Sequence, residues 1–163
     1  MRISKEDILQ HFEYKDGHLC WKKRSSFASR ITVGDKAGNI NCTGYVHIIF
    51  KGYCYKEHRL IWLMFNNDIP KYLDHINGNR SDNRIENLRP ANQNENNQNA
   101  KKRKDNTSGV KNVSFDKGRK KWIVRVQINK KTKYLGCYDD LELAALVAEE
   151  ARNKYHKEFA RHE

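Results

Sequence analysis

LDHINGNRSDNRIENLRPANQNENNQN, residues 73–99, is the stretch from which the rest of the chain is interpreted. It begins with an adjacent carboxylate and imidazole, Asp74 and His75, at the end of a short apolar segment. Two amide side chains, Asn87 and Asn96, follow in strongly polar surroundings, and Asn96 falls on a predicted helix. The stretch therefore supplies a candidate proton acceptor and several oxygen donors at fixed separations.

These side chains suit one kind of chemistry. The Asp74 carboxylate is a hard oxygen ligand for Mg²⁺ or Mn²⁺, and the amide oxygen of Asn96 can complete such a site without adding charge. The imidazole of His75 titrates near physiological pH and can take a proton from water. A divalent cation beside a general base is a minimal set for phosphodiester hydrolysis, because the cation offsets charge growing on the phosphate while the base activates water.

The offsets in this stretch resemble the HNH nuclease motif of phage-type homing endonucleases, in segments 74–79, 82–84, 86–89 and 95–96. The resemblance implies a ββα-metal finger in which His75 is the general base and Asn87 orients that base and its loop. It also implies one Mg²⁺ or Mn²⁺ per active site, bound by Asp74 and Asn96. Asn rather than His at position 96 matches the intron-type branch and favours a Mg²⁺-like ion over zinc.

Each residue also has a purely structural interpretation. An isolated Asp-His pair is structural more often than catalytic, Asn87 could be a turn or cap residue, and the Asn run at 92–99 could be a polar loop. We expect Asn77-Gly78 to form the bend between the two strands of the finger. Because several fixed offsets agree, catalysis is favoured over structure for the set as a whole.

The composition points to a polyanionic partner. The chain has 163 residues, enough for one domain or two small ones, and carries a net charge of +12 with pI ≈ 9.6. Nucleic acid is the leading partner, since an anionic membrane surface would call for a basic amphipathic helix with a broad apolar face. We expect double-stranded DNA as the partner, and neither a membrane nor a small-molecule cofactor.

The cysteines and the first residues predict a cytoplasmic location, in the host cell if the chain is phage-encoded. None of the four cysteines forms a Cys-x-x-Cys pair, so we expect small buried thiols in a reducing compartment. MRISKEDILQ, residues 1–10, is charged and lacks the apolar core of a signal peptide.

Charge is unevenly distributed along the chain. Residues 1–57 carry a net charge of +4, residues 58–100 are neutral, and residues 101–163 carry +8. The catalytic stretch is thus flanked by two basic arms, which suits a small metal site whose flanks hold the substrate backbone. The predicted organisation is a nuclease domain at 1–100 (strands in 1–57, helix and finger in 58–100), a basic linker at 101–107 and a DNA-binding domain at 108–163.

The nuclease half predicts strands followed by a helix and the finger. A Ser4–Asp7 capping box opens a short helix through about Tyr14. Further elements are expected as strands at 18–23, 44–50 and 53–56, a loop at 33–41, a hairpin turn at 51–52, a helix at 57–65 with His58 in a structural role, and a polar finger helix at about 91–101.

The C-terminal part predicts three strands and a helix. The strands are expected at 110–115, 121–129 and 132–138. Asp139 and Glu142 then form a capping box, and a small-residue stripe follows at Leu141, Ala144, Ala145, Ala148 and Ala151. Segments 108–110, 121–122, 134–139 and 144–145 resemble the AP2 (integrase-like) DNA-binding domain, which implies a three-stranded antiparallel sheet packed on one helix. The predicted fold class is therefore α+β throughout.

Basic and amide side chains mark the expected DNA contacts. They are Lys22, Lys23 and Arg24 in the first arm, Lys101, Lys102 and Arg103 in the linker, and Lys111, Arg125, Gln127 and Lys133 in the C-terminal sheet. Arg can recognise guanine and Gln adenine in the major groove. The first-arm cluster has an equally good interpretation as a solvated surface, and Trp122 is expected to pack rather than contact a base.

Together these patterns predict a site-directed DNA endonuclease of the HNH homing type, which hydrolyses phosphodiester bonds with one divalent metal. A single finger per chain makes nicking by a monomer natural, whereas cutting both strands requires a dimer or two events. Two alternatives remain: a catalytically silent DNA-binding regulator, and an RNA-directed binder or nuclease, which the charge alone permits.

Overall fold

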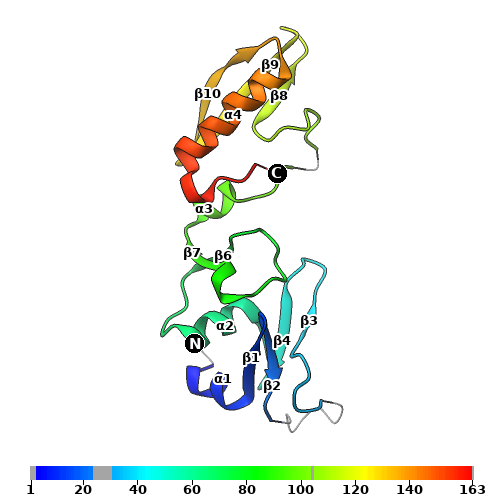
Figure 1. Cartoon of the computed structure of the whole chain (residues 1–163), viewed down its shortest axis with the longest axis vertical. Coiled ribbons are helices and arrows are strands. Elements are labelled where there is room, and N and C mark those ends of the chain that lie inside the picture. The colour runs from blue at the N-terminus through cyan, green and yellow to red at the C-terminus, as the bar shows by residue number, and fades with distance from the viewer. Residues whose placement is uncertain (1–2, 24–30, 104, 163) are drawn as a thin grey trace. The chain divides into compact units, whose positions relative to one another are not determined.

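The computed structural model describes residues 3–23, 31–103 and 105–162. It confirms the α+β class, with small antiparallel sheets and helices distributed over two compact units, Met1–Ala91 and Asn92–Glu163 (Figure 1). Each unit is described by itself below. The predicted linker at 101–107 lies within the second unit, and its role as a domain boundary stays a prediction.

The first unit begins with a short helix and a hairpin. Helix α1 spans Lys5–His11, and the predicted capping box is present, since Ser4 Oγ accepts from Asp7 N and Asp7 Oδ2 accepts from Ser4 N. The helix ends earlier than predicted, because β1 (Phe12–Lys15) follows at once and pairs antiparallel with β2 (His18–Trp21). Phe12 is fully buried as part of β1, and this burial is favoured over a longer helix α1.

The second hairpin leads directly into the apolar helix. Strand β4 (Val46–Phe50) pairs with β5 (Tyr53–Lys56) across the predicted turn, and the short β3 (Asn39–Ile40) adds to its other edge. Helix α2 spans Glu57–Phe65, as predicted. The core of this unit is built from side chains of all these elements: Ile3, Ile8, Phe12, Leu19, Trp21, Ala37, Ile48, Phe50, Leu60, Ile61, Leu63, Leu73 and Leu88.

The two strands of the finger are joined by a long loop. Strand β6 (Tyr72–His75) pairs antiparallel with β7 (Leu88–Ala91), so that His75 lies opposite Leu88. The expectation of a tight bend at Asn77-Gly78 is wrong: residues 76–87 form a loop that ends in a 3-10 turn at Ile85–Asn87. Gly78 begins this loop with a positive φ of 64°, and its N–H donates to the carbonyl of His75.

The β1–β2 hairpin supports the far end of this loop. The hydroxyl of Tyr14 accepts a hydrogen bond from Ile85 N at 3.2 Å. Gly17 has a φ of +82°, and a Cβ there would lie 2.9 Å from the backbone nitrogen of Arg84. Only glycine therefore permits the hairpin turn to approach the loop so closely.

The second unit begins with a shorter helix than predicted. Helix α3 spans only Gln93–Gln98, with Asn92 as N-cap and Glu95 completing a capping box. None of its residues is buried, so its polar sequence is accommodated without a core face.

A three-stranded sheet covered by one helix forms the rest of this unit. The strands are β8 (Val113–Asp116), β9 (Lys121–Ile128) and β10 (Lys131–Tyr138), in the order β10-β9-β8. Helix α4 (Leu141–His156) packs on β9, as Figure 1 shows for the orange ribbon against the sheet. Its N-cap is Asp140 rather than the expected Asp139, which instead pairs with Lys121.

The small residues along one side of α4 allow the helix to pack closely against the sheet. Ala144 and Ala148 are fully buried against Val113 and Val124, with Trp122 among the partly buried side chains around them. Trp122 therefore packs, as predicted.

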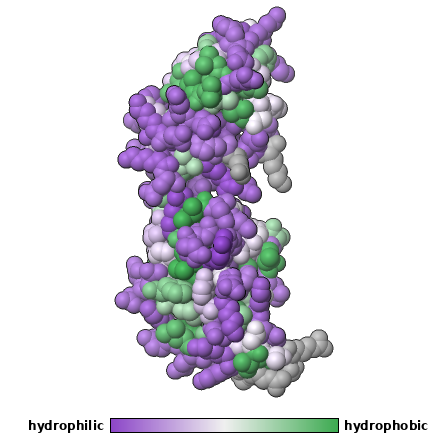
Figure 2. Space-filling model, viewed as in Figure 1, coloured by the Kyte–Doolittle hydropathy of each residue, from purple (hydrophilic) through white to green (hydrophobic). Residues whose placement is uncertain are grey.

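The face of the molecule seen in Figure 2 is mainly polar. Figure 2 shows hydrophilic residues over most of the visible face, with smaller apolar patches. None of the described helices is long and apolar enough to cross a membrane. All four cysteines are free thiols, but only Cys20 is buried; Cys42 and Cys54 are exposed, so the expectation of buried cysteines holds at one position.

Enlarging the helix–sheet contact of the second unit should destabilise it. We expect Ala148→Leu to lower the free energy of unfolding of this unit by about 1–3 kcal/mol, because Ala148 is fully buried in the helix–sheet core and the added atoms must displace its neighbours. Hydrogen exchange of the β9 amides would measure the change. Leu146→Ala, at a side chain that is 61% exposed on the same helix, is the control. Equal effects of the two variants would contradict close packing at Ala148.

Candidate active site

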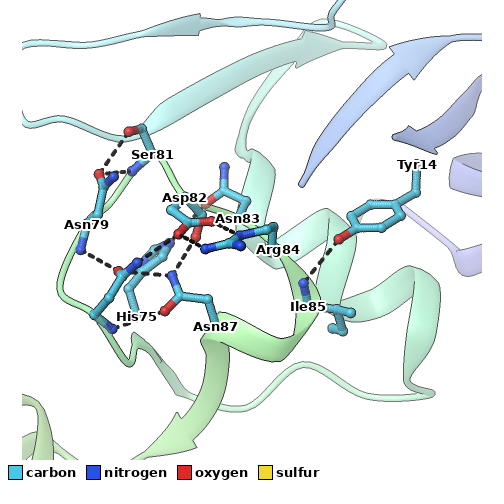
Figure 3. Close-up of polar contacts among 10 residues, drawn as sticks. Tyr14, His75, Asn79, Ser81, Asp82, Asn83, Arg84, Ile85 and Asn87 are labelled. Carbon is cyan, nitrogen blue, oxygen red and sulfur yellow. Dashed lines mark hydrogen bonds and ion pairs between the residues drawn. The ribbon is translucent and has the colours of Figure 1, made fainter. Parts of the chain in front are cut away.

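His75 lies at the end of β6, where the finger loop begins. The residue is 3% exposed, and its Nε2 lies 2.9 Å from Oδ1 of Asn83 on the loop (Figure 3). Burial lowers the pKa of the His75 imidazole, an effect that the Asn83 hydrogen bond and the nearby carboxylates of Asp74 and Asp82 partly oppose. The ring is thus favoured in its neutral form, the state in which it can accept a proton.

Behind Asn83 lies a buried carboxylate that the sequence did not indicate. Glu57 Oε2 accepts from Asn83 Nδ2 at 2.6 Å, and Glu57 Oε1 accepts from the backbone N–H of Leu19 at 2.8 Å. His18 Nδ1 lies 3.6 Å from Glu57 Oε2. Burial raises the pKa of Glu57, while these hydrogen bonds oppose the shift.

A second imidazole borders the first. The rings of His58 and His75 lie 4.9 Å apart, edge to face, and the ring of Tyr45 lies 5.3 Å from His58. Burial lowers the pKa of His58 to about 3, so this ring is neutral at neutral pH. The cations of Lys56 and Arg80 lie over the Tyr45 ring at 4.1 and 5.1 Å, which places positive charge near the site.

Asn87 closes the loop that His75 opens. Its Nδ2 donates to the carbonyl of Asp82 at 2.7 Å and to Asn77 Oδ1 at 3.0 Å, and its Oδ1 accepts from Asn77 N at 3.0 Å. One buried side chain at the end of the loop therefore holds both the start and the middle of the loop (Figure 3). The role in orienting the base that the HNH resemblance implies for Asn87 stays a prediction.

Asp82 stiffens the middle of the same loop. Arg84 donates to both carboxylate oxygens of Asp82 at 2.8 Å, and Asn77 Nδ2 donates to Asp82 Oδ2 at 2.7 Å (Figure 3). These donors hold the pKa of Asp82 far below its usual range. A bidentate pair of this kind fixes orientation as well as distance.

Asp74, the predicted metal ligand, lies on β6 opposite Arg89 of β7. Its Oδ2 accepts from Arg89 Nε at 3.2 Å and Nη2 at 3.1 Å, and both side chains are 12% exposed. Among the described residues, no group of three or more His, Cys, Asp and Glu is arranged to hold a metal ion.

The predicted donor set is of a different kind, with one carboxylate and one amide oxygen. Mg²⁺ characteristically binds one or two protein carboxylates, keeps several waters and takes further oxygens from substrate phosphates. The chemistry of Asp74 and Asn96 fits that preference. Asn96 is half-buried on α3, in the second unit, and its convergence with Asp74 stays a prediction.

The expected DNA contacts of the first arm lie on the surface. Lys22 and Lys23 are exposed after β2, and Lys22 Nζ donates to the carbonyl of Leu9 at 3.1 Å. Arg24 lies outside the described residues.

The linker side chains are exposed, whereas Lys111 is not. Lys101, Lys102 and Arg103 are exposed, with Lys102 Nζ donating to the carbonyl of Gly109 at 2.6 Å. Lys111 Nζ is half-buried and donates to the carbonyls of Gln98 and Ala100 at 2.8 and 2.6 Å. Burial lowers the pKa of Lys111 to about 8. In this arrangement Lys111 ties the segment after α3 to the sheet.

The sheet presents its predicted DNA contacts on two different faces. Arg125 and Gln127 are exposed and share the face turned away from α4, where Tyr134 and Thr132 lie opposite them on β10. Lys133 lies opposite Val126, which is buried, and its Nζ donates to the hydroxyl of Tyr155 on α4 at 2.8 Å. Lys133 thus belongs to the helix side, since side chains alternate along a strand.

Sequence reasoning missed the buried pair Glu57 and Asn83. Glu57 precedes the His58-Arg59-Leu60 segment, and nothing in its sequence context distinguishes it from an exposed helix N-terminal acid. Asn83 belongs to the quoted HNH segment 82–84, but no role was assigned to it. Asn-rich loops satisfy themselves in many ways, so only coordinates reveal which amide faces the imidazole.

The sequence of this chain is similar to those of known proteins. A family model described as HNH endonuclease matches residues 55–98. The chain is also 38% identical over 108 residues to protein 3.8 of Escherichia phage T7, covering 65% of this chain and 88% of the phage protein. No solved structure matches. The chain therefore belongs to the same family as phage T7 protein 3.8 and carries an HNH endonuclease domain.

Proposed function

We propose that this chain is a metal-dependent DNA endonuclease of the HNH homing type, which hydrolyses phosphodiester bonds at chosen sites. The observation that carries the proposal is the buried, neutral-favoured imidazole of His75, adjacent to the carboxylate of Asp74 at the end of β6. The family match over the same residues supports a nuclease rather than another hydrolase.

In the proposed reaction His75 takes a proton from the attacking water. Asn87 keeps the loop, and with it the imidazole, in one orientation. Mg²⁺ or Mn²⁺, held by Asp74 and Asn96, would supply charge stabilisation at the phosphate and at the leaving oxygen. By the HNH resemblance the products carry 5′-phosphate and 3′-hydroxyl ends.

The second unit is proposed to select the site, as an AP2-like sheet lying in the major groove. Its open face carries Arg125 and Gln127, whose side chains can recognise guanine and adenine edges. The basic arm and linker, with Lys22, Lys23 and residues 101–103, would hold the phosphate backbone, and Lys133 would act from the helix side as a backbone contact.

One observation favours the silent-regulator alternative. The ion pair between Asp74 and Arg89 satisfies a carboxylate that a cation would otherwise bind. A regulator would bind DNA without nicking it, whereas the nuclease must exchange part of this pair for metal. Plasmid nicking with Mg²⁺ separates the two functions.

Removal of the base should abolish cleavage. We expect His75→Ala to lower the single-turnover nicking rate by roughly 10²- to 10⁴-fold, the usual contribution of a general base, while DNA affinity stays nearly intact. Nicking of supercoiled plasmid and a gel-shift titration would measure the two quantities. His162→Ala, at an exposed imidazole, is the control. Loss of binding without a specific loss of rate would make His75 structural.

Base preference should depend on the open sheet face. Arg125→Ala should cost about 1–3 kcal/mol of discrimination at one base pair, as for a bidentate contact to guanine. Lys133→Ala, from the helix side, should change affinity without changing preference. Selection of cleaved sites from random duplexes would compare them. An unchanged preference in Arg125→Ala would refute recognition through this face.

Contacts between basic side chains and DNA phosphates should make DNA binding steeply salt-dependent. The logarithm of the association constant should fall linearly with the logarithm of salt concentration, with a slope of about −0.9 per neutralised phosphate. Lys102→Ala should reduce that slope by about 1. Lys15→Ala, at an exposed cation of β1 that pairs with Glu13, should leave it unchanged. A flat salt response of the full chain would contradict this part of the proposal.

A further inference from the structure

Three buried side chains from three elements form a continuous hydrogen-bonded chain. Glu57 opens α2, Asn83 lies on the finger loop, and His75 ends β6; their exposed fractions are 0%, 1% and 3%. The Glu57 Oε2–Asn83 Nδ2 distance is 2.6 Å, and the Asn83 Oδ1–His75 Nε2 distance is 2.9 Å. This inference rests on the proposed role of His75 as the general base.

The donors and acceptors in this series of hydrogen bonds have a fixed order, because its first member is a carboxylate. Both oxygens of Glu57 accept hydrogen bonds, Oε1 from Leu19 N–H and Oε2 from Asn83 Nδ2, so the amide NH₂ of Asn83 faces Glu57. The amide oxygen of Asn83 then faces His75 and can bond only to an N–H at Nε2. A neutral imidazole with its proton on Nε2 carries its lone pair on Nδ1.

We propose that Glu57 and Asn83 are positioning residues that hold the proton of His75 on Nε2 and so make Nδ1 the atom that accepts a proton from water. Glu57 acts through Asn83 and touches no reacting group. Outer partners of this kind fix the tautomer and ring orientation of a histidine, and their loss impairs function without removing the histidine.

A purely structural role for Glu57 makes a different prediction. The Leu19 N–H bond to Glu57 Oε1 anchors β2 to α2, and any side chain with an oxygen in that place would preserve it. Glu57→Gln keeps the size of the side chain and can keep this bond. Its new amide NH₂ would then face Asn83, which must rotate its own amide and present NH₂ to His75.

The test is therefore which ring nitrogen of His75 carries the proton. In the wild-type protein, the ¹⁵N shifts of the His75 ring should give a protonated Nε2 and an unprotonated Nδ1. In Glu57→Gln the assignment should reverse. His156, whose Nε2 lies 2.9 Å from the carbonyl of Gln127 in the second unit, is an internal reference that keeps its proton on Nε2 in both proteins.

The cleavage rate should follow the tautomer. Glu57→Gln should lower the single-turnover nicking rate by roughly 10- to 100-fold, with the dissociation constant for DNA unchanged. Glu13→Gln, at an exposed acid on β1 that pairs with Lys15, is the matched control and should cleave as the wild type does.

Moving the carboxylate from position 57 to position 83 should restore the donor–acceptor order at His75. In the double variant Glu57→Gln/Asn83→Asp, the carboxylate at position 83 accepts both from the amide at position 57 and from His75 Nε2. We expect its His75 shifts to return to the wild-type pattern and most of the lost rate to be recovered. The ¹⁵N spectrum of each variant also reports whether the protein is folded, so a variant that merely failed to fold is recognised before its rate is compared.

The outcomes separate this inference from the proposed function. If wild-type protein and Glu13→Gln do not nick DNA while the His75 shifts respond as expected, the nuclease proposal fails and the positioning of the ring stands. If the wild-type protein nicks DNA and Glu57→Gln keeps both its rate and its His75 shifts, the positioning role is overturned. An inverted tautomer with an unchanged rate also overturns it.

Discussion

The carboxylate of Glu57 is the constraint on which the nuclease unit depends. A buried charge is costly unless each oxygen is hydrogen-bonded, and removing one partner of a buried ionic contact typically costs about 3–5 kcal/mol. Glu57 meets this requirement with Leu19 N–H, Asn83 Nδ2 and the nearby His18. Strand β2, helix α2 and the finger loop are therefore joined at one point, directly behind His75.

The loop around His75 derives its rigidity from local hydrogen bonds rather than apolar packing. Asn87, at its end, bonds to Asn77 near its start and to Asp82 in its middle, and Asp82 also pairs with Arg84. The β1–β2 hairpin supports it from outside through Tyr14 and Gly17. A side chain held this closely needs little reorganisation during a reaction, which suits the role of general base proposed for His75.

The sequence predicted the regular elements well where periodicity and turn residues agree. Helix α2, the β4–β5 hairpin and strands β9 and β10 follow the expected ranges closely, whereas β8 begins three residues later than predicted. Sequence-based prediction was wrong where tertiary contacts override local preference. Phe12 lies in a strand rather than in the predicted helix, and a twelve-residue loop joins His75 to Leu88 in place of the predicted Asn77-Gly78 bend. At the site, motif spacing pointed to His75 and Asn87, but burial of Glu57 has no signature in sequence.

Diffraction from the full chain in complex with duplex DNA and Mn²⁺, using the anomalous signal of the metal, would locate the metal and the attacked phosphate together. We expect one Mn²⁺ that contacts oxygens of Asp74, Asn96 and a DNA phosphate. We also expect His75 Nδ1 at a hydrogen-bonding distance of about 2.6–3.2 Å from a water beside that phosphate. A Mn²⁺ and phosphate bound elsewhere, with Asp74 still paired to Arg89 and Asn96 remote, would contradict the account.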